Sequence, residues 1–516
     1  MRSSFTLLLC ASLSITTPAR AQSWTLDPDF ADEGRLIIDV DQSIDEVSSM
    51  AVRDDGKILI AGWATPFSLN FSGAIVAQVG PDGVLDESFG HLGIAGTYLS
   101  DRSLFANAMV EQPDHAVILA GGSVNTLSER DAIVLRYLAD GSADPDFGAD
   151  SMVTTDLGGN EVFTAVALDD LGRIICAGRV GGSILVVRYD AGGVLDPGFG
   201  IGGVQEVPLG LGTLSGYVGM GLCSDGKIAL ACPSVDGLVL ARLEEDGDPD
   251  ATFGTDGVIT TGEEIAFHAL LVQPDDFVLI GGGAPLDVNE ECQGFQLMRY
   301  DPEGILDPAL DGDGIARTLI SAGCPELFGL ALLSDGRILA SGTGNSEDTF
   351  ADLTAVRYLP DGSLDPTFDD DGMVLVDMGC NAMDVAYTIA LETDDDVVVA
   401  GLTDCGQWPN DIAAIRLQPE VNTAIGGPAP RTGVASVQPN PAQDETWLEY
   451  TITTDQAVSL ELRDVQGRRV NGLLAQQPRP AGTYREALAL DGLSAGLYTA
   501  VLSHGDAVER VRFVKE

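Results

Sequence analysis

The chain has 516 residues, of which 45% are hydrophobic and 6% aromatic, and it contains 62 glycines. Asp and Glu outnumber Lys and Arg by 79 to 27, and the resulting formal charge of −52 argues against nucleic acids and anionic membranes as partners, because their phosphates would be repelled. The length exceeds what one ordinary core supports, and the Gly- and Asp-rich composition favours a repetitive all-β protein.

Residues 1–21 have the pattern of a secretory signal peptide. Arg2 precedes an apolar run at 5–15, and an A-x-A cleavage site stands at 19–21. We therefore expect the mature chain to begin at Gln22. No other segment reaches 18 uninterrupted apolar residues, so no membrane span is predicted.

A short phrase, LDPTF or a close variant, recurs seven times between residues 26 and 368. Its aspartates follow one another at intervals of 52 to 59 residues, and they are Asp27, Asp86, Asp144, Asp196, Asp250, Asp307 and Asp365. A period in this range is typical of a propeller or a solenoid. Because about 55 residues is roughly twice what one solenoid coil needs, we predict an all-β, seven-bladed propeller over 22–420, with a β-solenoid as the alternative.

The seventh repeat shows the predicted unit, in which four apolar segments of strand length follow the phrase. These segments are 372–378, 386–393, 396–403 and 411–418. In several repeats an Asp-Gly turn of the kind preferred in tight hairpins separates the second and third segments. The third segment is a continuous apolar run, which predicts an antiparallel strand covered on both faces. Each unit is therefore predicted to be a four-stranded blade packed between two neighbours.

An arginine on the last strand of most repeats stands eight residues before the aspartate of the next phrase. These arginines are Arg136, Arg188, Arg242, Arg299 and Arg357, and Gln78 holds the position in the first repeat. We predict that each pair forms an ion pair or hydrogen bond that links the turn leaving one blade to the entry of the next. Arg416 and Asp27 lack such partners in sequence, so we expect them to meet and help to close the ring. The Phe of each phrase is expected to pack between blades.

The phrase, the DGKILIAG-like segments and the arginine-bearing strands resemble the delta-60 repeat of secreted bacterial proteins. The resemblance covers about 26–418. It implies a propeller-like β fold and no catalytic residues, because the family has no established activity to carry over.

The last eighty residues have a different character. A Pro/Gly/Ala/Thr-rich linker is predicted at 421–434, followed by a small β-sandwich at 435–516. The motifs in this segment resemble the type A sorting domain of the Bacteroidota type IX secretion system. The residues that carry the likeness are Pro439, Asn440, Pro441, Gly467, Gly496 and Tyr498, with a terminal F-V-K. The likeness implies contact with that secretion machinery and release from, or attachment to, the outer cell surface; an ordinary accessory sandwich is the alternative.

Seven cysteines follow the signal segment, and export permits disulfides. The loops that carry Cys292, Cys324, Cys380 and Cys405 are predicted to emerge on one face of the propeller. We therefore predict two bridges, Cys292–Cys324 between blades five and six and Cys380–Cys405 within blade seven. Cys176, Cys223 and Cys232 lie in or beside strands and are expected to remain thiols.

No cofactor or catalytic residue is predicted. The acidic turns at 311–314 and 369–372 resemble part of a Ca²⁺ loop, but the first ligand position is not acidic and no Glu closes the loop. Turn chemistry is therefore preferred for these turns, with Ca²⁺ binding as the alternative. The four histidines lack zinc-site spacing, and the G-x-S-x-G at 492–496 lacks a following helix.

These features favour a non-enzymatic exported propeller that binds a glycan, a surface polymer or a protein through variable loops at 63–73, 122–131 and 284–294. The aromatic residues that suggest sugar stacking are Trp63, Phe67, Phe71 and Trp408. The alternatives are a structural scaffold and a polysaccharide-active enzyme with paired carboxylates. A group of carboxylates with raised pKa in the central channel would favour the enzyme.

Overall fold

A computed structural model describes most of the chain, and every regular element among the described residues is a strand. The described residues are 24–209, 216–284, 294–320, 325–344, 351–369, 371–379, 383–392, 396–405, 410–419, 436–438, 446–452, 456–464, 469–488, 490, 493, 496–504 and 507–515. The predicted signal peptide and linker lie outside them. The chain divides into two compact units, 1–420 and 421–516.

The first unit consists of seven antiparallel sheets, the blades of a propeller. Blade 1 contains β3 (Ser43–Val52), β4 (Ile58–Pro66), β5 (Gly73–Val79) and β6 (Ile94–Thr97). Blade 2 contains β7 (Arg102–Glu111), β8 (Val117–Asn125), β9 (Arg130–Tyr137) and β10 (Met152–Thr155). Blade 3 contains β11 (Glu161–Leu168), β12 (Ile174–Val180), β13 (Ser183–Tyr189) and β14 (Val204–Pro208).

The remaining four blades continue the same order. Blade 4 contains β15 (Gly219–Leu222), β16 (Ile228–Ser234), β17 (Gly237–Leu243) and β18 (Val258–Thr260). Blade 5 contains β19 (Ala266–Val272), β20 (Val278–Gly283), β21 (Phe295–Tyr300) and β22 (Ile315–Thr318). Blade 6 contains β23 (Leu327–Leu332), β24 (Ile338–Gly344), β25 (Asp352–Tyr358) and β26 (Met373–Val376). Blade 7 contains β27 (Asp384–Leu391), β28 (Val397–Thr403), β29 (Asp411–Pro419), β1 (Trp24–Leu26) and β2 (Arg35–Ile38).

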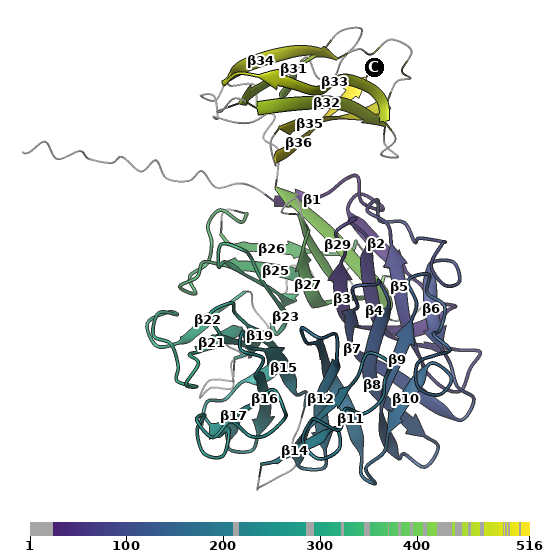
Figure 1. Cartoon of the computed structure of the whole chain (residues 1–516), viewed down its shortest axis with the longest axis vertical. Coiled ribbons are helices and arrows are strands. Elements are labelled where there is room, and N and C mark those ends of the chain that lie inside the picture. Colours follow the sequence, from purple (N-terminus) through teal and green to yellow (C-terminus); the bar gives the residue numbers. More distant parts are fainter. Residues whose placement is uncertain are drawn as a thin grey trace, which may run out of the picture. The chain divides into compact units, whose positions relative to one another are not determined.

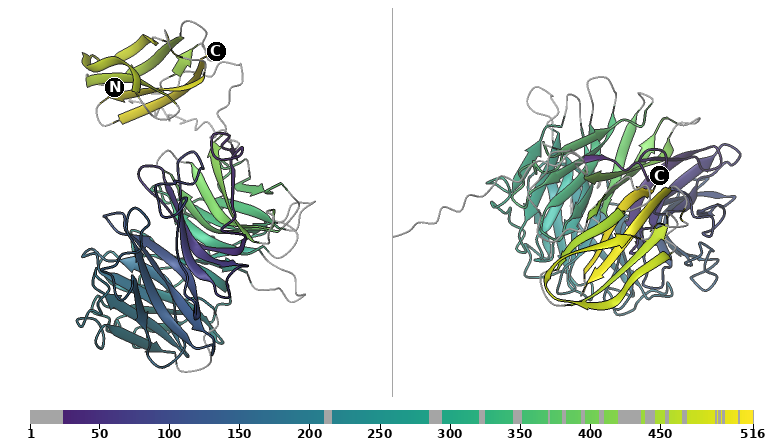
Figure 2. Two further views of the ribbon diagram at one scale, coloured as in Figure 1. Left: turned by 90° about the vertical axis from the view of Figure 1, so that its right-hand side faces the viewer. Right: turned by 90° about the horizontal axis from the view of Figure 1, so that it is seen from above.

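The first strand of each blade lies nearest the axis (Figure 1). Each of these inner strands contacts the inner strand of the next blade, in the closed order β3, β7, β11, β15, β19, β23, β27 and back to β3. The ring is closed by the N-terminal strands β1 and β2, which pair with β29 and complete blade 7. Their purple ribbons lie beside the light-green β29 in Figures 1 and 2.

One sequence prediction about the blade boundary is wrong. The segment 372–378 was expected to be the first strand of the seventh unit, but β26 pairs with β25 as the outermost strand of blade 6. The phrase therefore lies within a blade, between its third and fourth strands, rather than between two blades. The period of a sequence repeat gives the length of the unit but not the point at which one blade ends. That point depends on which blade the outermost strand pairs with.

The core consists of apolar layers between neighbouring blades, because each blade buries both of its faces. In β4, Leu59 packs toward blade 2 while Ile58 and Ile60 pack toward blade 7. All seven residues of β5 are buried. This two-sided burial explains why the central strands are apolar runs without alternation, as the sequence predicts.

The second unit, described by itself, contains two sheets. One is formed by β30 (Ser436–Gln438), β31 (Thr446–Ile452) and β34 (Gly482–Leu488), and the other by β33 (Arg469–Arg479), β32 (Gln456–Asp464), β35 (Gly496–His504) and β36 (Ala507–Lys515). Side chains from both sheets, including Leu448 and Tyr450 from the first and Leu460 and Leu502 from the second, form one buried cluster. The unit is a small β-sandwich.

Candidate functional site

The antiparallel strand order gives the propeller two faces of different origin. The hairpins between first and second strands and the phrases between third and fourth strands emerge at one end, here named the clip face. The loops between second and third strands and the connections from each outer strand to the next blade emerge at the other end, here named the loop face. The predicted ion pairs lie on the clip face and the predicted variable loops on the loop face.

Each phrase aspartate and the arginine or glutamine predicted to contact it are here called a clip. The structure brings the two residues of every predicted clip together. The arginine Nε donates to the aspartate Oδ2 at 2.5 to 2.8 Å in Arg136–Asp144, Arg188–Asp196, Arg242–Asp250, Arg299–Asp307, Arg357–Asp365 and Arg416–Asp27. In blade 1, Gln78 Nε2 donates to Asp86 Oδ2 at 2.8 Å. The two residues without sequence partners, Arg416 and Asp27, meet across the ring closure as predicted.

Within each pair both residues belong to one blade, so the link between blades comes from another atom. Arg416 Nη1 donates to the carbonyl of Pro81 in blade 1 at 2.7 Å, and Arg136 Nη1 donates to the carbonyl of Ala191 in blade 3 at 2.6 Å. Most of the other clip arginines make the same contact. The aromatic residue of the phrase packs beside this link, as Phe199 does between blades 3 and 4. The clip therefore joins blades through the guanidinium fork and the Phe.

The acidic turns considered for Ca²⁺ belong to this clip. Asp311 and Asp369 directly follow the buried Leu310 and Phe368, at the position where four of the other five phrases have Gly, and both have φ of +49°. Asp tolerates this left-handed conformation better than most residues do. Asp313 and Asp371 accept hydrogen bonds from main-chain N–H groups two residues later. Turn geometry accounts for these described acids; position 370 lies outside the described residues.

A second cation joins several clips, and the sequence analysis missed it. Lys57 and Lys227 follow Asp-Gly turns, and their Nζ atoms lie 2.9 Å from Asp86 and Asp250 respectively. The Ser88 hydroxyl and Lys57 hold the pKa of Asp86 well below its usual range. Burial raises the pKa of Asp250, but hydrogen bonds from Thr252, Lys227 and Arg242 outweigh it and the net shift is downward. The sequence feature that could have predicted these contacts is the basic residue directly after the Asp-Gly turn.

The inner strands surround a central cavity of about 650 Å³. Six of them carry a β-bulge at the same level, and each bulge turns one side chain toward this cavity. The bulged residues are Ser48, Asn107, Thr164, His268, Phe328 and Tyr387, and all of them line the cavity. His268 Nε2 lies 3.3 Å from Glu326 Oε2. No sequence pattern indicated these bulges.

Among the described residues that line this cavity, Glu46 is the single carboxylate. Burial raises its pKa, and a hydrogen bond with Asn410 opposes that shift. The other carboxyls with raised pKa, Asp45, Asp384 and Asp411, are not among the cavity-lining residues. The paired carboxylates that a glycosidase would need therefore do not occur together among the described lining residues.

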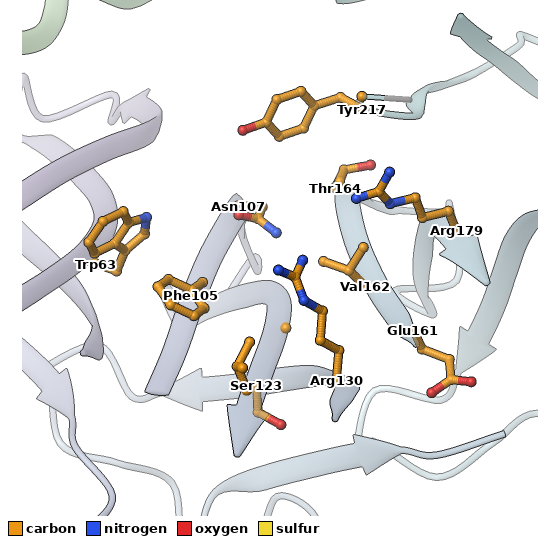
Figure 3. A pocket seen from close by; sticks show the side chains of 13 residues that line it. Trp63, Phe105, Asn107, Ser123, Arg130, Glu161, Val162, Thr164, Arg179 and Tyr217 are labelled. Atoms are coloured by element: carbon orange, nitrogen blue, oxygen red, sulfur yellow. The ribbon is translucent and has the colours of Figure 1, made fainter. Parts of the chain in front are cut away.

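A second, smaller pocket of about 270 Å³ opens on the loop face among blades 1, 2, 3 and 4. Trp63 and Phe105 form one wall, with their rings edge to face at a centroid distance of 5.1 Å. Tyr217, whose side chain is half exposed, lies opposite them (Figure 3). These rings provide an apolar, partly open surface.

Two arginines complete this pocket. The guanidinium groups of Arg130 and Arg179 point toward its centre from β9 and β12, and Asn107 and Thr164 also line it (Figure 3). The side chain of Arg130 has no ion-pair partner within the described part of the chain, in contrast to the clip arginines. The predicted loops at 63–73 and 122–131 supply Trp63, Arg130 and residues 122–124, but the remaining lining residues come from elements that the sequence did not connect.

The other predicted residues are placed as follows. Phe67 is 56% exposed and does not line the pocket, and neither does Phe71. Trp408 and most of 284–294 lie outside the described residues. So do Cys292, Cys324 and Cys380, whereas Cys405 is disulfide-bonded. Cys176, Cys223 and Cys232 are free thiols.

In the second unit, Gly496 begins β35 and Tyr498 is buried in the core of the sandwich. The predicted motif residues Pro439, Asn440, Pro441 and Gly467 lie outside the described residues. Among the described residues there is also no helix that is long and apolar enough to cross a membrane.

Comparison with known families supports both units. The model "Domain of unknown function (DUF5122) beta-propeller" matches residues 53–89, 112–147, 223–253 and 333–368. The model "Secretion system C-terminal sorting domain" matches residues 436–516. The chain is a repeat protein that carries DUF5122 β-propeller repeats and a type IX secretion sorting domain. It is accordingly a protein that is secreted or attached to the outer cell surface, and its sorting domain implies interaction with the type IX secretion machinery.

No curated protein matches the chain. Solved structures with a similar course of the chain include a protein of unknown function from Dyadobacter fermentans, at 12% identity and a TM-score of 0.38, covering 75% of this chain and 98% of that one. Another is the polysaccharide lyase Uly1, at 9% identity and a TM-score of 0.37, covering 72% and 89%. A third is regucalcin from Agrobacterium tumefaciens, at 13% identity and a TM-score of 0.33, covering 61% and 86%.

Proposed function

We propose that the exported propeller is a non-enzymatic binding protein that recognises a glycan carrying scattered acidic groups at the loop-face pocket. The observation that carries the proposal is the convergence of Arg130 and Arg179 on a pocket walled by Trp63 and Phe105. Aromatic rings present a broad apolar surface to the C–H face of a sugar, and guanidinium groups pair with carboxylate or sulfate in a two-pronged geometry.

The size of the pocket suits part of a polymer. Its volume of about 270 Å³ is near the lower end of ligand pockets, roughly 300 to 1,000 Å³, and accommodates one or two sugar units. The remainder of a chain would extend across the loop face. Because the pocket is open on that face, a polymer need not be threaded through the propeller.

The charge of the whole protein restricts the ligand further. A net charge of −52 repels a polymer with a charge on every unit, as it repels nucleic acid. Beyond a Debye length of about 8 Å at physiological salt this repulsion is screened, so the two local arginines decide the interaction with an isolated acidic sugar. We therefore expect a glycan of low charge density.

The test is retention of the full secreted chain on three polysaccharides. Gellan carries a carboxylate on only some of its units, alginate carries one on every unit, and dextran carries none. We expect the tightest binding to gellan. Trp63→Ala and Arg130→Ala should each weaken it about 10- to 100-fold, as expected for a lost charged hydrogen bond or a lost stacking surface. Phe67→Ala, a change of an exposed aromatic outside the pocket, is the matched control.

Three outcomes would overturn the proposal. One is equal retention on gellan and dextran. Another is retention that does not change in Trp63→Ala and Arg130→Ala. The third is a shortening of the polymer during incubation, measured by size-exclusion chromatography. That result would establish an enzyme and direct attention to Glu46, His268 and Tyr387 in the central cavity.

A further inference from the structure

We propose that the propeller binds Ca²⁺ at three equivalent carboxylate clusters between neighbouring blades on the loop face. The clusters are Asp39, Asp45 and Asp411 between blades 7 and 1, Asp131, Asp156 and Glu161 between blades 2 and 3, and Asp352, Asp377 and Asp384 between blades 6 and 7. None of them belongs to the acidic turns of the clip face. One of these acids, Glu161, also lines the loop-face pocket, but the proposal does not depend on glycan binding and is tested without any polysaccharide.

The three clusters occupy the same place in the blade architecture. The first acid directly follows an outer strand, as Asp39 follows β2. The second stands at the start of the third strand of the same blade, as Asp411 begins β29. The third stands near the start of the next inner strand, as Asp45 does in β3. Three chain segments therefore each direct one acid to a single junction, and the arrangement occurs three times in the ring.

Another junction shows how the same position is filled without acids. Between blades 1 and 2 the corresponding residues, by strand register, are Gly73, Tyr98 and Leu104. The Tyr98 ring occupies the space beside Gly73, where an added Cβ would lie only 2.3 Å from it. The fold thus accepts an aromatic and apolar filling here, and three acids are not a requirement of the blade junction.

The dimensions of the clusters suit Ca²⁺. In each cluster one oxygen from every acid lies within 4.8 Å of one from each of the others. Oxygens on opposite sides of a Ca²⁺ ion stand about 4.6 to 5.2 Å apart, because each Ca–O distance is about 2.3 to 2.6 Å. Ca²⁺ also accepts irregular coordination and bidentate carboxylates, whereas Mg²⁺ requires a tighter octahedron.

Buried oxygens without hydrogen bonds supply independent support. Asp411 is 1% exposed, and neither of its carboxylate oxygens has a hydrogen-bond partner among the described residues. Glu161 is fully buried, and its Oε2 likewise has none. A buried carboxylate oxygen left without a partner is costly, and the usual partners are a cation or a hydrogen-bond donor. A bound ion would satisfy these oxygens.

The charges near the cluster between blades 7 and 1 also favour a cation, whereas one acid of the cluster between blades 2 and 3 already has a cationic neighbour. Within the described part of the chain, no Lys or Arg forms an ion pair with the three acids between blades 7 and 1. Arg102 lies 3.4 Å from Asp131 in the cluster between blades 2 and 3.

The experiment counts bound Ca²⁺ on the full secreted chain after treatment with EDTA, by equilibrium dialysis against Ca²⁺ alone. We expect three ions per chain and a rise of the Tm by several degrees on addition of Ca²⁺. Asp411→Asn should reduce the count to two. Asp236→Asn, a change at an exposed loop-face carboxylate outside the clusters, should leave it at three.

Folding of the variant is checked in the same experiment. Because Asp411 accepts no hydrogen bond from the described residues, Asp411→Asn in EDTA should melt at or above the temperature of the wild-type protein. No bound Ca²⁺ in the wild type would overturn the proposal. One or two ions in the wild type would overturn the equivalence of the clusters, and three ions in Asp411→Asn would overturn the assignment between blades 7 and 1.

Discussion

The clip face and the loop face are built at opposite ends of the same strands, yet they differ in how strictly the blades repeat. On the clip face six blades place a side chain eight residues before the phrase aspartate, blade 7 places Arg416 beside Asp27, and the hydrogen bond between the two residues recurs in all seven blades. On the loop face the pocket involves four blades, and the carboxylate clusters occupy three junctions. A feature that every blade repeats serves the packing of blades, and function is better sought where the repeat is broken.

The two faces also differ in how their charges are neutralised. On the clip face, buried aspartates such as Asp27 are paired with arginine and accept further hydrogen bonds from main-chain N–H groups. On the loop face, Asp411 is buried without such partners and Arg130 is exposed without an ion pair among the described residues. The first arrangement is complete within the chain, whereas the second is suited to partners from outside it.

The largest expected effect is at the ring closure. Arg416→Ala should lower the free energy of unfolding by about 3 to 5 kcal/mol, because it leaves the buried Asp27 without its cation. Denaturant unfolding monitored by fluorescence measures the change. Arg416→Gln is the informative control, since Gln78 already holds the equivalent position in blade 1, and it should cost clearly less than Arg416→Ala. A loss below 1 kcal/mol for Arg416→Ala would contradict a stabilising role for the clip.

Acid should weaken the clip face next. The pKa values of Asp86, Asp196, Asp250 and Asp365 are lowered by their hydrogen bonds and ion pairs, so these groups hold fewer protons in the folded than in the unfolded chain. Their stabilisation is therefore complete above the ordinary Asp value of about 3.9 and is lost as the pH falls through the lower folded values.

Scanning calorimetry between pH 5 and pH 2 tests this expectation. The Tm should fall steeply below pH 4, and it should fall less steeply in Asp250→Asn, which has one fewer such carboxylate. A Tm that stayed level down to pH 3 would contradict the assignment of the pKa shifts to the clips.

A smaller effect is expected at the second cation of the clip. Lys227 lies 2.9 Å from Asp250 but its side chain is 21% exposed, so solvent screens the pair. Lys227→Ala should change the free energy of unfolding by about 0.2 to 1 kcal/mol, in the range of exposed ion pairs. Arg242→Ala removes both a partner of the same aspartate and the hydrogen bond to the Pro302 carbonyl of blade 5, so it should cost more in the same denaturant titration. The reverse order would show that the turn lysine, rather than the strand arginine, holds the clip.

The contrast between faces also explains what the sequence can reveal. Arg136 and Asp144 were found because their interval recurs, and Arg416 and Asp27 because they were left over from that pattern. Asp45 and Asp411 lie far apart in the chain and meet only where blade 7 contacts blade 1. Each stands near the end of a strand, where a single acidic residue does not indicate a site. The phase of the repeat was misread for a related reason, since pairing of β26 with β25 depends on the return of the chain in space.

The smallest expected effect on stability distinguishes the faces most directly. Arg130→Ala removes the same type of side chain as Arg416→Ala, but the guanidinium of Arg130 is exposed and forms no ion pair with a described residue. The free energy of unfolding should therefore change by no more than about 0.5 kcal/mol. Retention on gellan should nevertheless fall, whereas Arg416→Gln, where it remains folded, should retain it. If Arg130→Ala destabilised the propeller as strongly as Arg416→Ala, Arg130 would have to be regarded as a residue that stabilises the fold. A stable Arg130→Ala variant with lost binding would instead show that an arginine outside the repeated pattern acts on a ligand rather than on the fold.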